Sequence, residues 1–193
     1  MDMEKLRGLL TKSASLYEQW QGLRAAGVRL LQNALNISER MPALHNLHNY
    51  QELPDPSQLQ RLLLAKQAQA LDNVFQRLHQ NIQNMEDVVR GLERQCVDSW
   101  AVLHAAKAST EACATLQLGS CTSVACMVEC VEDIWYGCRD ELAARAASLS
   151  TLDPGSPPLL FSAACALYNG AVPCCLAQRP APQGRPPVHP YKG

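Results

Sequence analysis

Residues 71–96 read LDNVFQRLHQNIQNMEDVVRGLERQC. Steps of four and three residues alternate between the apolar side chains of this segment, which are Leu71, Phe75, Leu78, Ile82, Met85, Val89, Leu92 and Cys96. Such spacing predicts a helix with one apolar stripe, sustained over more than three heptads. Polar residues lie between the stripe positions, among them Gln80, Asn81 and Gln83, and we expect them to face solvent. A single helix cannot bury its own stripe, so the pattern also predicts partner helices.

The same helix extends in both directions from this segment. Toward the C-terminus, Trp100 and Leu103 continue the apolar stripe as far as Ala108. Toward the N-terminus, Asp55 or Ser57 can cap the first turn, because an Asp or Ser side chain accepts hydrogen bonds from the first free backbone amides. The predicted helix therefore covers more than a quarter of the chain.

An earlier segment, residues 2–40, also has apolar residues at the spacing of one helical face. Gly22 and Gly27 each weaken a helix relative to Ala, so we expect one helix that bends near them. Pro42 lacks the amide proton and its ring clashes with the preceding turn, which predicts that the helix ends before it. Residues 42–56 then form a connection with one short helical turn.

A third helix is expected to begin at Thr122 or Ser123, after a hinge at residues 109–120. Its apolar residues follow helical spacing and are Val124, Met127, Val131, Ile134, Trp135, Cys138 and Leu142. Its acidic residues mark the side expected to face solvent and are Glu129, Glu132, Asp133, Asp140 and Glu141. No strand-like alternation occurs before residue 150. The predicted fold class is all-α, an antiparallel bundle of three long helices with coiled-coil-like packing.

The composition changes after residue 150. Most of the twelve prolines lie in residues 151–193, in pieces such as DPGSPP and RPAPQGRPP. Proline at this density opposes helix and sheet, although Leu159–Leu176 is apolar enough for a brief helix. We therefore predict a helical bundle domain at residues 1–150 and a disordered, flexible Pro-rich tail at 151–193. The abrupt change is also compatible with an alternative C-terminal end.

Charge and composition exclude several classes of protein. The formal net charge is -1 over 193 residues, so the chain lacks the basic surplus typical of proteins that bind nucleic acid or anionic membranes. No apolar run approaches the roughly 20 residues that span a bilayer, and MDMEKLRGLL does not resemble a signal peptide. Nine cysteines, an odd number, without a secretory signal predict reduced thiols in the nucleus, the cytoplasm or both.

The cysteines and carboxylates do not form a pattern typical of an active site. Cys121, Cys126, Cys130 and Cys138 include no C-x-x-C pair, and Cys138 falls on the apolar stripe, so we interpret them as small buried or half-buried side chains rather than zinc ligands. Glycine-rich phosphate loops are absent from the sequence. Consecutive carboxylates on a helix diverge by about 100° and cannot act as a pair. We predict no enzyme activity, no cofactor and no metal.

One segment resembles a known family. Residues 123–134, SVACMVECVEDI, are similar to the SVAxMxExxxDI segment of the AAA-ATPase-interacting ribosome maturation factors, and shorter matches run from Gln21–Leu23 through Pro42–Leu44 to Leu78. The resemblance covers roughly residues 10–147 in consistent order. After the DI pair, family members continue with a basic, aromatic stretch, whereas this chain continues with alanines and a proline-rich segment.

The resemblance implies a non-enzymatic adaptor. Its expected partners are AAA ATPase subunits and a second small helical subunit, with pre-ribosomal particles bound indirectly and neither nucleic acid nor membrane bound directly. The implied role is cytoplasmic maturation of the large ribosomal subunit, by release of a shuttling assembly factor, together with replisome proteostasis on chromatin. Nuclear and cytoplasmic localisation follows. Within the resembling segment, Glu129, Glu132, Asp133 and Trp135 are the candidate partner-binding residues.

Two other classes remain open at this point. A long apolar stripe also fits a general coiled-coil scaffold subunit of a cytoskeletal or centrosomal complex. The cysteine content leaves a thiol-metal or redox protein as the other alternative.

Overall fold

The computed structural model describes residues 3–107 and 123–169, and it is helical nearly throughout. In order along the chain, its elements are α1 (Met3–His45), the 3₁₀ helix η1 (Leu47–Tyr50), α2 (Pro56–Lys107), α3 (Val124–Ser150) and α4 (Pro158–Asn169). The all-α class is confirmed, with four α-helices in place of three among the described residues. None of these helices is long and apolar enough to cross a membrane. The hinge at residues 109–120, the possible cap Thr122 and residues 170–193 lie outside the described residues.

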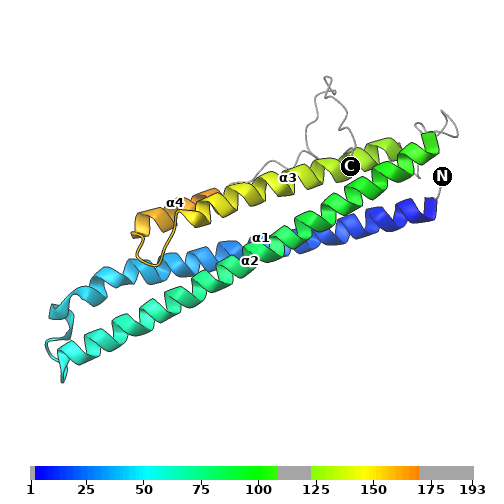
Figure 1. The fold of residues 1–193 in the computed structure, drawn as a ribbon. Coiled ribbons are helices and arrows are strands. Elements are labelled where there is room, and N and C mark those ends of the chain that lie inside the picture. The colour runs from blue at the N-terminus through cyan, green and yellow to red at the C-terminus, as the bar shows by residue number, and fades with distance from the viewer. Residues whose placement is uncertain (1–2, 108–122, 170–193) are drawn as a thin grey trace, which may run out of the picture.

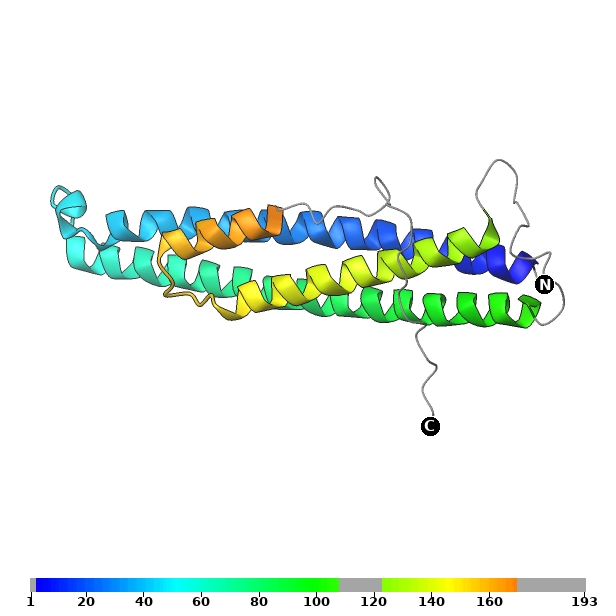
Figure 2. The same cartoon turned by 90° about the horizontal axis from the view of Figure 1, so that it is seen from above.

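Long helices give the described part of the molecule the shape of a rod (Figures 1 and 2). The helices α1 and α2 form an antiparallel hairpin, and α3 returns along α2. The short helix α4 lies on α1 and runs opposite to it, since Ser156 just before α4 is bonded to Ser38, whereas Tyr168 near the end of α4 lies beside Gly27. Each long helix is therefore covered by at least one neighbour.

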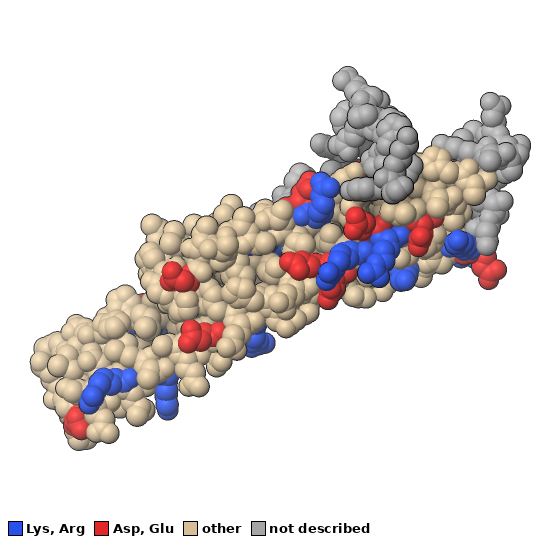
Figure 3. Space-filling view, viewed as in Figure 1, with Lys and Arg blue, Asp and Glu red and all other residues tan. Residues whose placement is uncertain are grey.

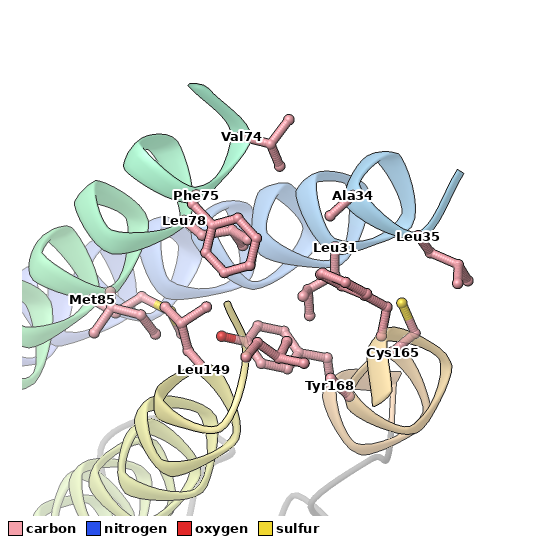
Figure 4. Packing of buried hydrophobic residues seen from close by; sticks show 14 of the residues in the cluster. Leu31, Ala34, Leu35, Val74, Phe75, Leu78, Met85, Leu149, Cys165 and Tyr168 are labelled. Atoms are coloured by element: carbon pink, nitrogen blue, oxygen red, sulfur yellow. The ribbon is translucent and has the colours of Figure 1, made fainter. Parts of the chain in front are cut away.

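The apolar stripe predicted at residues 71–96 is confirmed as the centre of the core. All eight stripe residues are buried, and the largest cluster of buried side chains joins seven of them, all but Cys96, to residues of α1, α3 and α4. Figure 4 shows part of this cluster, with Phe75 and Leu78 of α2 facing Leu31 of α1 and Tyr168 of α4. A second, smaller cluster near the other end of the rod consists of Leu6, Val102, Leu103, Val124 and Val128.

The buried face of α2 is wider than the sequence indicated. A third column of residues, spaced by seven, is also buried and consists of Val74, Asn81, Val88, Gln95 and Val102. The expectation that Asn81 faces solvent is wrong: it is buried, and its amide Nδ2 donates to the backbone oxygen of Leu23 over 3.1 Å. Because α2 packs against both α1 and α3, it needs a broader buried face than a helix with one partner.

The predicted end of the first helix before Pro42 is also wrong, because α1 includes Pro42 and continues to His45. A proline this close to the end deprives the helix of a single hydrogen bond. The last carbonyl groups are bonded from outside the helix, since Nε2 of Gln60 donates to the oxygens of Leu44 and His45 over 3.0 and 2.9 Å. The phenol of Tyr50 also donates to the Leu44 oxygen, over 3.2 Å. These contacts explain why the turn after the proline persists.

At the start of α2 the sequence left Asp55 and Ser57 as alternative caps. The structure assigns the cap to Asp55, whose carboxylate accepts the backbone amide of Gln58 over 3.3 Å. Pro56 follows as the first helical residue, where the missing amide proton costs no hydrogen bond.

Helical structure continues past the domain boundary predicted at residue 150. Residues 158–169, where the sequence allowed a brief helix within the predicted tail, form α4, and they are part of the bundle, since Phe161, Ala164, Cys165 and Tyr168 are buried in the main cluster. The rings of Phe161 and Phe75 meet edge to face with centroids 6.0 Å apart. Pro158 opens the helix rather than breaking it, because a proline is well tolerated in the first turn. The ordered bundle therefore includes residues beyond the predicted boundary at 150.

Gly22 and Gly27 both lie within the continuous helix α1 but have different surroundings. A Cβ built at Gly22 meets nothing within 4 Å, whereas one at Gly27 would lie 3.0 Å from Oδ1 of Asn81 and 3.3 Å from a ring carbon of Tyr168. Gly27 thus permits α2 and α4 to approach α1 closely, while Gly22 serves no packing role.

We predict opposite effects of alanine at these two positions. Gly22→Ala should raise the free energy of unfolding by about 0.5–1 kcal/mol, through helix propensity. Gly27→Ala should lower it by roughly 1–3 kcal/mol, through overpacking. Urea denaturation followed by circular dichroism measures both. Equal stabilisation by the two variants would contradict the close approach at Gly27.

Candidate functional site

The helix α3 carries every candidate site residue proposed from the sequence. Ser123 caps its start, with the side-chain oxygen accepting the backbone amide of Cys126 over 3.4 Å, which agrees with one of the two caps predicted. One side of the helix is buried against the bundle, and its members are Val124, Val128, Val131, Cys138, Glu141, Arg145 and Leu149. The helix therefore presents its remaining faces at the flank of the rod (Figure 2).

Two of the four candidates occupy the middle of the face opposite the buried side. Glu129 and Asp133 share this face with Tyr136 and Asp140, since residues spaced by four and three lie on one line of a helix. We call these four residues the α3 outer stripe. Asp140 is exposed and the other three are half-buried. The stripe carries three carboxylates around one aromatic ring.

The other two candidates are turned toward the bundle. Glu132 lies close enough to Cys96 of α2 for its carboxylate to contribute to the raised pKa of that thiol. Trp135 is half-buried and packs against the main cluster. The structure therefore separates the four candidates into a pair on the α3 outer stripe and a pair beside α2 and the core.

Beside the stripe lies an aromatic cluster that the sequence did not predict as a unit. The rings of Trp135 and Tyr136 have centroids 4.6 Å apart, and the guanidinium carbon of Arg139 lies 5.6 Å from the first and 4.8 Å from the second. Arg139 also pairs with Asp140 over 3.0 Å. The spacing of Trp135 and Arg139 by four residues is the signal that could have indicated this contact.

A buried network of charged side chains lies further along α3. Glu141 was expected on the solvent side, but it is buried and its Oε1 accepts from Nε of Arg145 over 2.8 Å and from Nε of Arg24 over 3.0 Å. The expectation is wrong because Glu141 falls where α3 meets α1. Two guanidinium groups on one carboxylate compensate the cost of removing its charge from water.

Arg145 extends this network to α4. Its side chain is only 3% exposed, and its Nη2 donates to the backbone oxygen of Tyr168 over 2.9 Å. The guanidinium also lies 4.3 Å from the centre of the Tyr168 ring. Burial raises the pKa of the Tyr168 phenol, partly offset by the positive charge of Arg145. Arg24, Glu141, Arg145 and Tyr168 together join α1, α3 and α4, and we call them the buried polar cluster.

The charged contacts of the buried polar cluster join α3 to α1 and to α4. Three buried polar atoms in or beside the cluster have no hydrogen-bond partner among the described residues. They are Oδ1 of the neighbouring Asn81, Nη1 of Arg145 and the hydroxyl oxygen of Tyr168. Each charged contact that the cluster makes connects one helix with another or with the next turn of the same helix. Such a cluster fixes how far the helices slide along each other, because any shift leaves a buried charge without its counter-charge.

The cysteines of the described residues are mostly enclosed. Cys138 is buried in the main cluster as predicted, Cys96 and Cys165 are buried, and Cys126 and Cys130 are half-buried. Burial raises the pKa of the Cys96 thiol to about 12, with contributions from the charges of Glu132 and Glu93. Cys121 lies outside the described residues, and within them no group of three or more His, Cys, Asp and Glu side chains could hold a metal ion.

Removal of the Glu141 carboxylate should lower the stability of the fold. We expect Glu141→Ala to lower the free energy of unfolding by about 3–5 kcal/mol, because Arg145 would stay buried without its counter-charge. Asp140→Ala is the matched control, since Asp140 is exposed and its pairing with Arg139 is worth at most about 1 kcal/mol. Urea denaturation of both variants measures the change in the free energy of unfolding. Equal losses in the two variants would show that the buried contact stabilises the fold no more than the exposed one.

Alkaline pH should destabilise the protein through Cys96. The folded state raises the pKa of this thiol from 9.0 to about 12, so its contribution to stability is complete below pH 9 and is lost as the pH rises toward 12. The free energy of unfolding, measured between pH 8 and pH 10.5, should fall less steeply in Cys96→Ala than in the unaltered chain. Ser99→Ala serves as control, because it changes a buried residue of the same helix without removing a titratable group, and it should retain the original slope. An unchanged slope in Cys96→Ala would contradict the shift.

One known family matches most of the described helices in sequence. A family model described as ribosome biogenesis protein C1orf109-like matches residues 3–163, which include α1, α2, α3 and the first half of α4. No curated protein matches the chain. The match covers the smaller core cluster, the α1, α2 and α3 members of the main cluster, the α3 outer stripe and the charged pair Glu141 and Arg145. Ala164, Cys165 and Tyr168 of the main cluster lie beyond it. The chain therefore belongs to the C1orf109-like family of ribosome biogenesis proteins.

Proposed function

We propose that this protein is a non-enzymatic adaptor subunit of an AAA ATPase complex that acts in cytoplasmic maturation of the large ribosomal subunit. The observation that carries the proposal is membership of a ribosome biogenesis family over residues 3–163. The adaptor role itself comes from the resemblance of residues 123–134 to the AAA-ATPase-interacting maturation factors. In this role the protein helps the ATPase to release a shuttling assembly factor from the particle.

The geometry is suited to an adaptor. A rod built from helices of 43 and 52 residues offers long side surfaces, on which two partners can bind at separate positions. Its ionised side chains are of both signs and gather over part of the rod (Figure 3), which is consistent with the net charge of -1. Such a mixed surface favours protein partners over a nucleic acid backbone.

The proposed partners are AAA ATPase subunits and a second small helical subunit, with pre-ribosomal particles bound through them. The protein then works in both cytoplasm and nucleus, where the same complex supports replisome proteostasis on chromatin. Neither a membrane nor nucleic acid is a direct ligand in this proposal, and the chain supplies no catalytic group or cofactor.

We assign the contact with a partner to the α3 outer stripe and its flank. Glu129, Asp133 and Asp140 supply negative charge there, and the adjacent rings of Trp135 and Tyr136 supply flat apolar area. Aromatic side chains surrounded by charge are typical of protein interfaces. Glu132 acts more indirectly, because it lies toward Cys96 and so positions α3 against α2.

Affinity capture of the full chain from cells tests the function. We expect AAA ATPase subunits and large-subunit precursors to be enriched, and their enrichment to fall at least about tenfold in the double variant Glu129→Lys, Asp133→Lys, because charge reversal repels a complementary surface. Asp87→Lys on α2 is the control, since Asp87 is exposed in a pair with Arg90 far along the sequence from α3. Circular dichroism of each variant verifies the fold.

Other results of the same capture would count against the proposal. Enrichment of tubulin-associated or centrosomal proteins without ATPase subunits favours the alternative scaffold function. Normal capture of the ATPase by a folded Glu129→Lys, Asp133→Lys variant retains the adaptor role but contradicts the assignment of the α3 outer stripe.

A further inference from the structure

The two apolar clusters of the rod are separate along its length. The smaller cluster lies at the end of the rod where α1 and α3 begin and α2 ends (Figure 2). On α2 the main cluster ends at Leu92, and the smaller cluster begins at Val102. The helix also has buried residues between these two positions. Those residues decide how firmly the end of the rod is joined to the main core.

The buried residues between the clusters are mostly polar. Five of them belong to neither cluster, and we call them the dividing layer: Ser13 of α1, Gln95, Cys96 and Ser99 of α2, and Val131 of α3. The three buried columns of α2 are apolar at residues 88, 89 and 92, and one heptad later they carry the α2 members of the layer. On α1, Ser13 lies seven residues from both Leu6 and Trp20, which belong to the two clusters. The apolar pattern is therefore interrupted on both helices.

The interruptions in α1 and α2 lie at the same level of the rod. Leu16 packs on Gly91, where an added Cβ would lie 3.1 Å from its side chain. Leu6 shares the smaller cluster with Val102. Because the two helices are antiparallel, Ser13 lies opposite the stretch of α2 between these two contacts.

The helix α3 crosses the same level at Val131. The following residue, Glu132, lies close enough to Cys96 for its charge to act on the thiol. Before this point Val128 belongs to the smaller cluster, and after it Cys138 belongs to the main one. The dividing layer thus extends across all three long helices.

The dividing layer holds the helices together weakly. Gln95 and Ser99 are only 4% and 0% exposed, yet Oε1 of the first and Oγ of the second have no hydrogen-bond partner among the described residues. The Ser13 hydroxyl donates to the backbone oxygen of Leu9 over 2.9 Å, within its own helix, so it does not connect two helices. A buried polar atom without a partner disfavours the closed state, because water would bond to it.

We propose that the rod opens at this end as one unit, by separation of the helices beyond the dividing layer while the main cluster stays folded. The unit comprises residues 3–12 of α1, 97–107 of α2 and 124–130 of α3. Opening gives the oxygens of Gln95 and Ser99 access to water, which offsets part of the loss of the smaller cluster. Segments with few buried apolar contacts open below the free energy of global unfolding.

The opening divides the α3 outer stripe. Glu129 belongs to the unit that opens, whereas Tyr136 and Asp140 lie beyond the layer and stay with the main core. A partner bound along the whole stripe therefore favours the closed rod, because only the closed rod holds both parts of the stripe in line. This consequence rests on the proposed function, but the opening itself is a property of the chain alone.

Amide hydrogen exchange of the full chain, followed by NMR, measures the opening. Helical amides of the unit should have similar protection on all three helices, and they should exchange at least about tenfold faster than those of residues 75–92 in the main core. Fraying of separate helices produces instead a steady decrease of protection toward each helix end. Such a gradient without a step at the dividing layer, or equal protection in the unit and the main core, would overturn the proposal.

Gly22→Ala separates this opening from global unfolding. Gly22 lies in α1 outside the unit, and alanine there stabilises the helix through propensity. Amides of the main core should exchange about two- to fivefold more slowly in this variant, because they exchange through global unfolding. The amides of the unit should be unaffected, because α1 keeps this turn when the end opens. Equal slowing of both sets would show that the end opens only when the whole rod unfolds.

Gln95→Met tests the cause of the opening. Methionine has a similar length but lacks the unpartnered oxygen, so the amides of the unit should exchange at least about fivefold more slowly. Gln83→Met, at an exposed position of the same helix, is the matched control and should leave the exchange unchanged. Circular dichroism verifies that both variants fold. Unaltered or faster exchange in Gln95→Met would contradict the assignment of the weak point to the dividing layer.

Discussion

The apolar side of α2 must be covered along its length, and the rest of the molecule is arranged to cover it. Water would otherwise contact a column of leucine, valine and phenylalanine side chains over most of 52 residues. No single neighbour covers all of it. The helix α1 covers one side throughout, α3 covers the C-terminal part, and Phe161 of α4 reaches Phe75. The buried face of α2 is consequently three residues wide in each heptad.

Apolar cover alone does not determine how the helices align along the rod, because a helix that slides by one heptad buries a similar area. The buried polar cluster supplies this alignment. Glu141 must meet Arg24 of α1, and Arg145 must meet the end of α4, so the three helices have one register in which the charges are paired. Gly27 belongs to the same region, since its lack of a side chain lets Tyr168 and Asn81 approach α1.

In this member of a ribosome biogenesis family, polar groups inside the bundle and side chains on its surface have different roles. The polar groups of the interior connect helices to one another, while the α3 outer stripe and the exposed side of α4, which carries Leu159 and Leu167, lie on different helices and differ in chemistry. One is acidic and aromatic, and the other is apolar and uncharged. Both helices are held on the same rod, because α3 and α4 pack into one core cluster.

The sequence by itself determined the helical class, the eight stripe residues of α2 and the burial of Cys138, because periodicity is a local property of the chain. It left the cap of α3 between Thr122 and Ser123, and the structure shows Ser123 in that position. It also indicated the four candidate residues of α3, but it did not show which of them face outward. Tertiary structure alone decided that Asn81 and Glu141 are buried, that α1 passes Pro42 and that residues 158–169 join the core. Each of these outcomes depends on a side chain or backbone group far away in sequence: Leu23 for Asn81, Arg24 for Glu141, Gln60 for the end of α1 and Phe75 for α4. Local propensity is worth about 1 kcal/mol or less per residue, and a buried contact of this kind outweighs it.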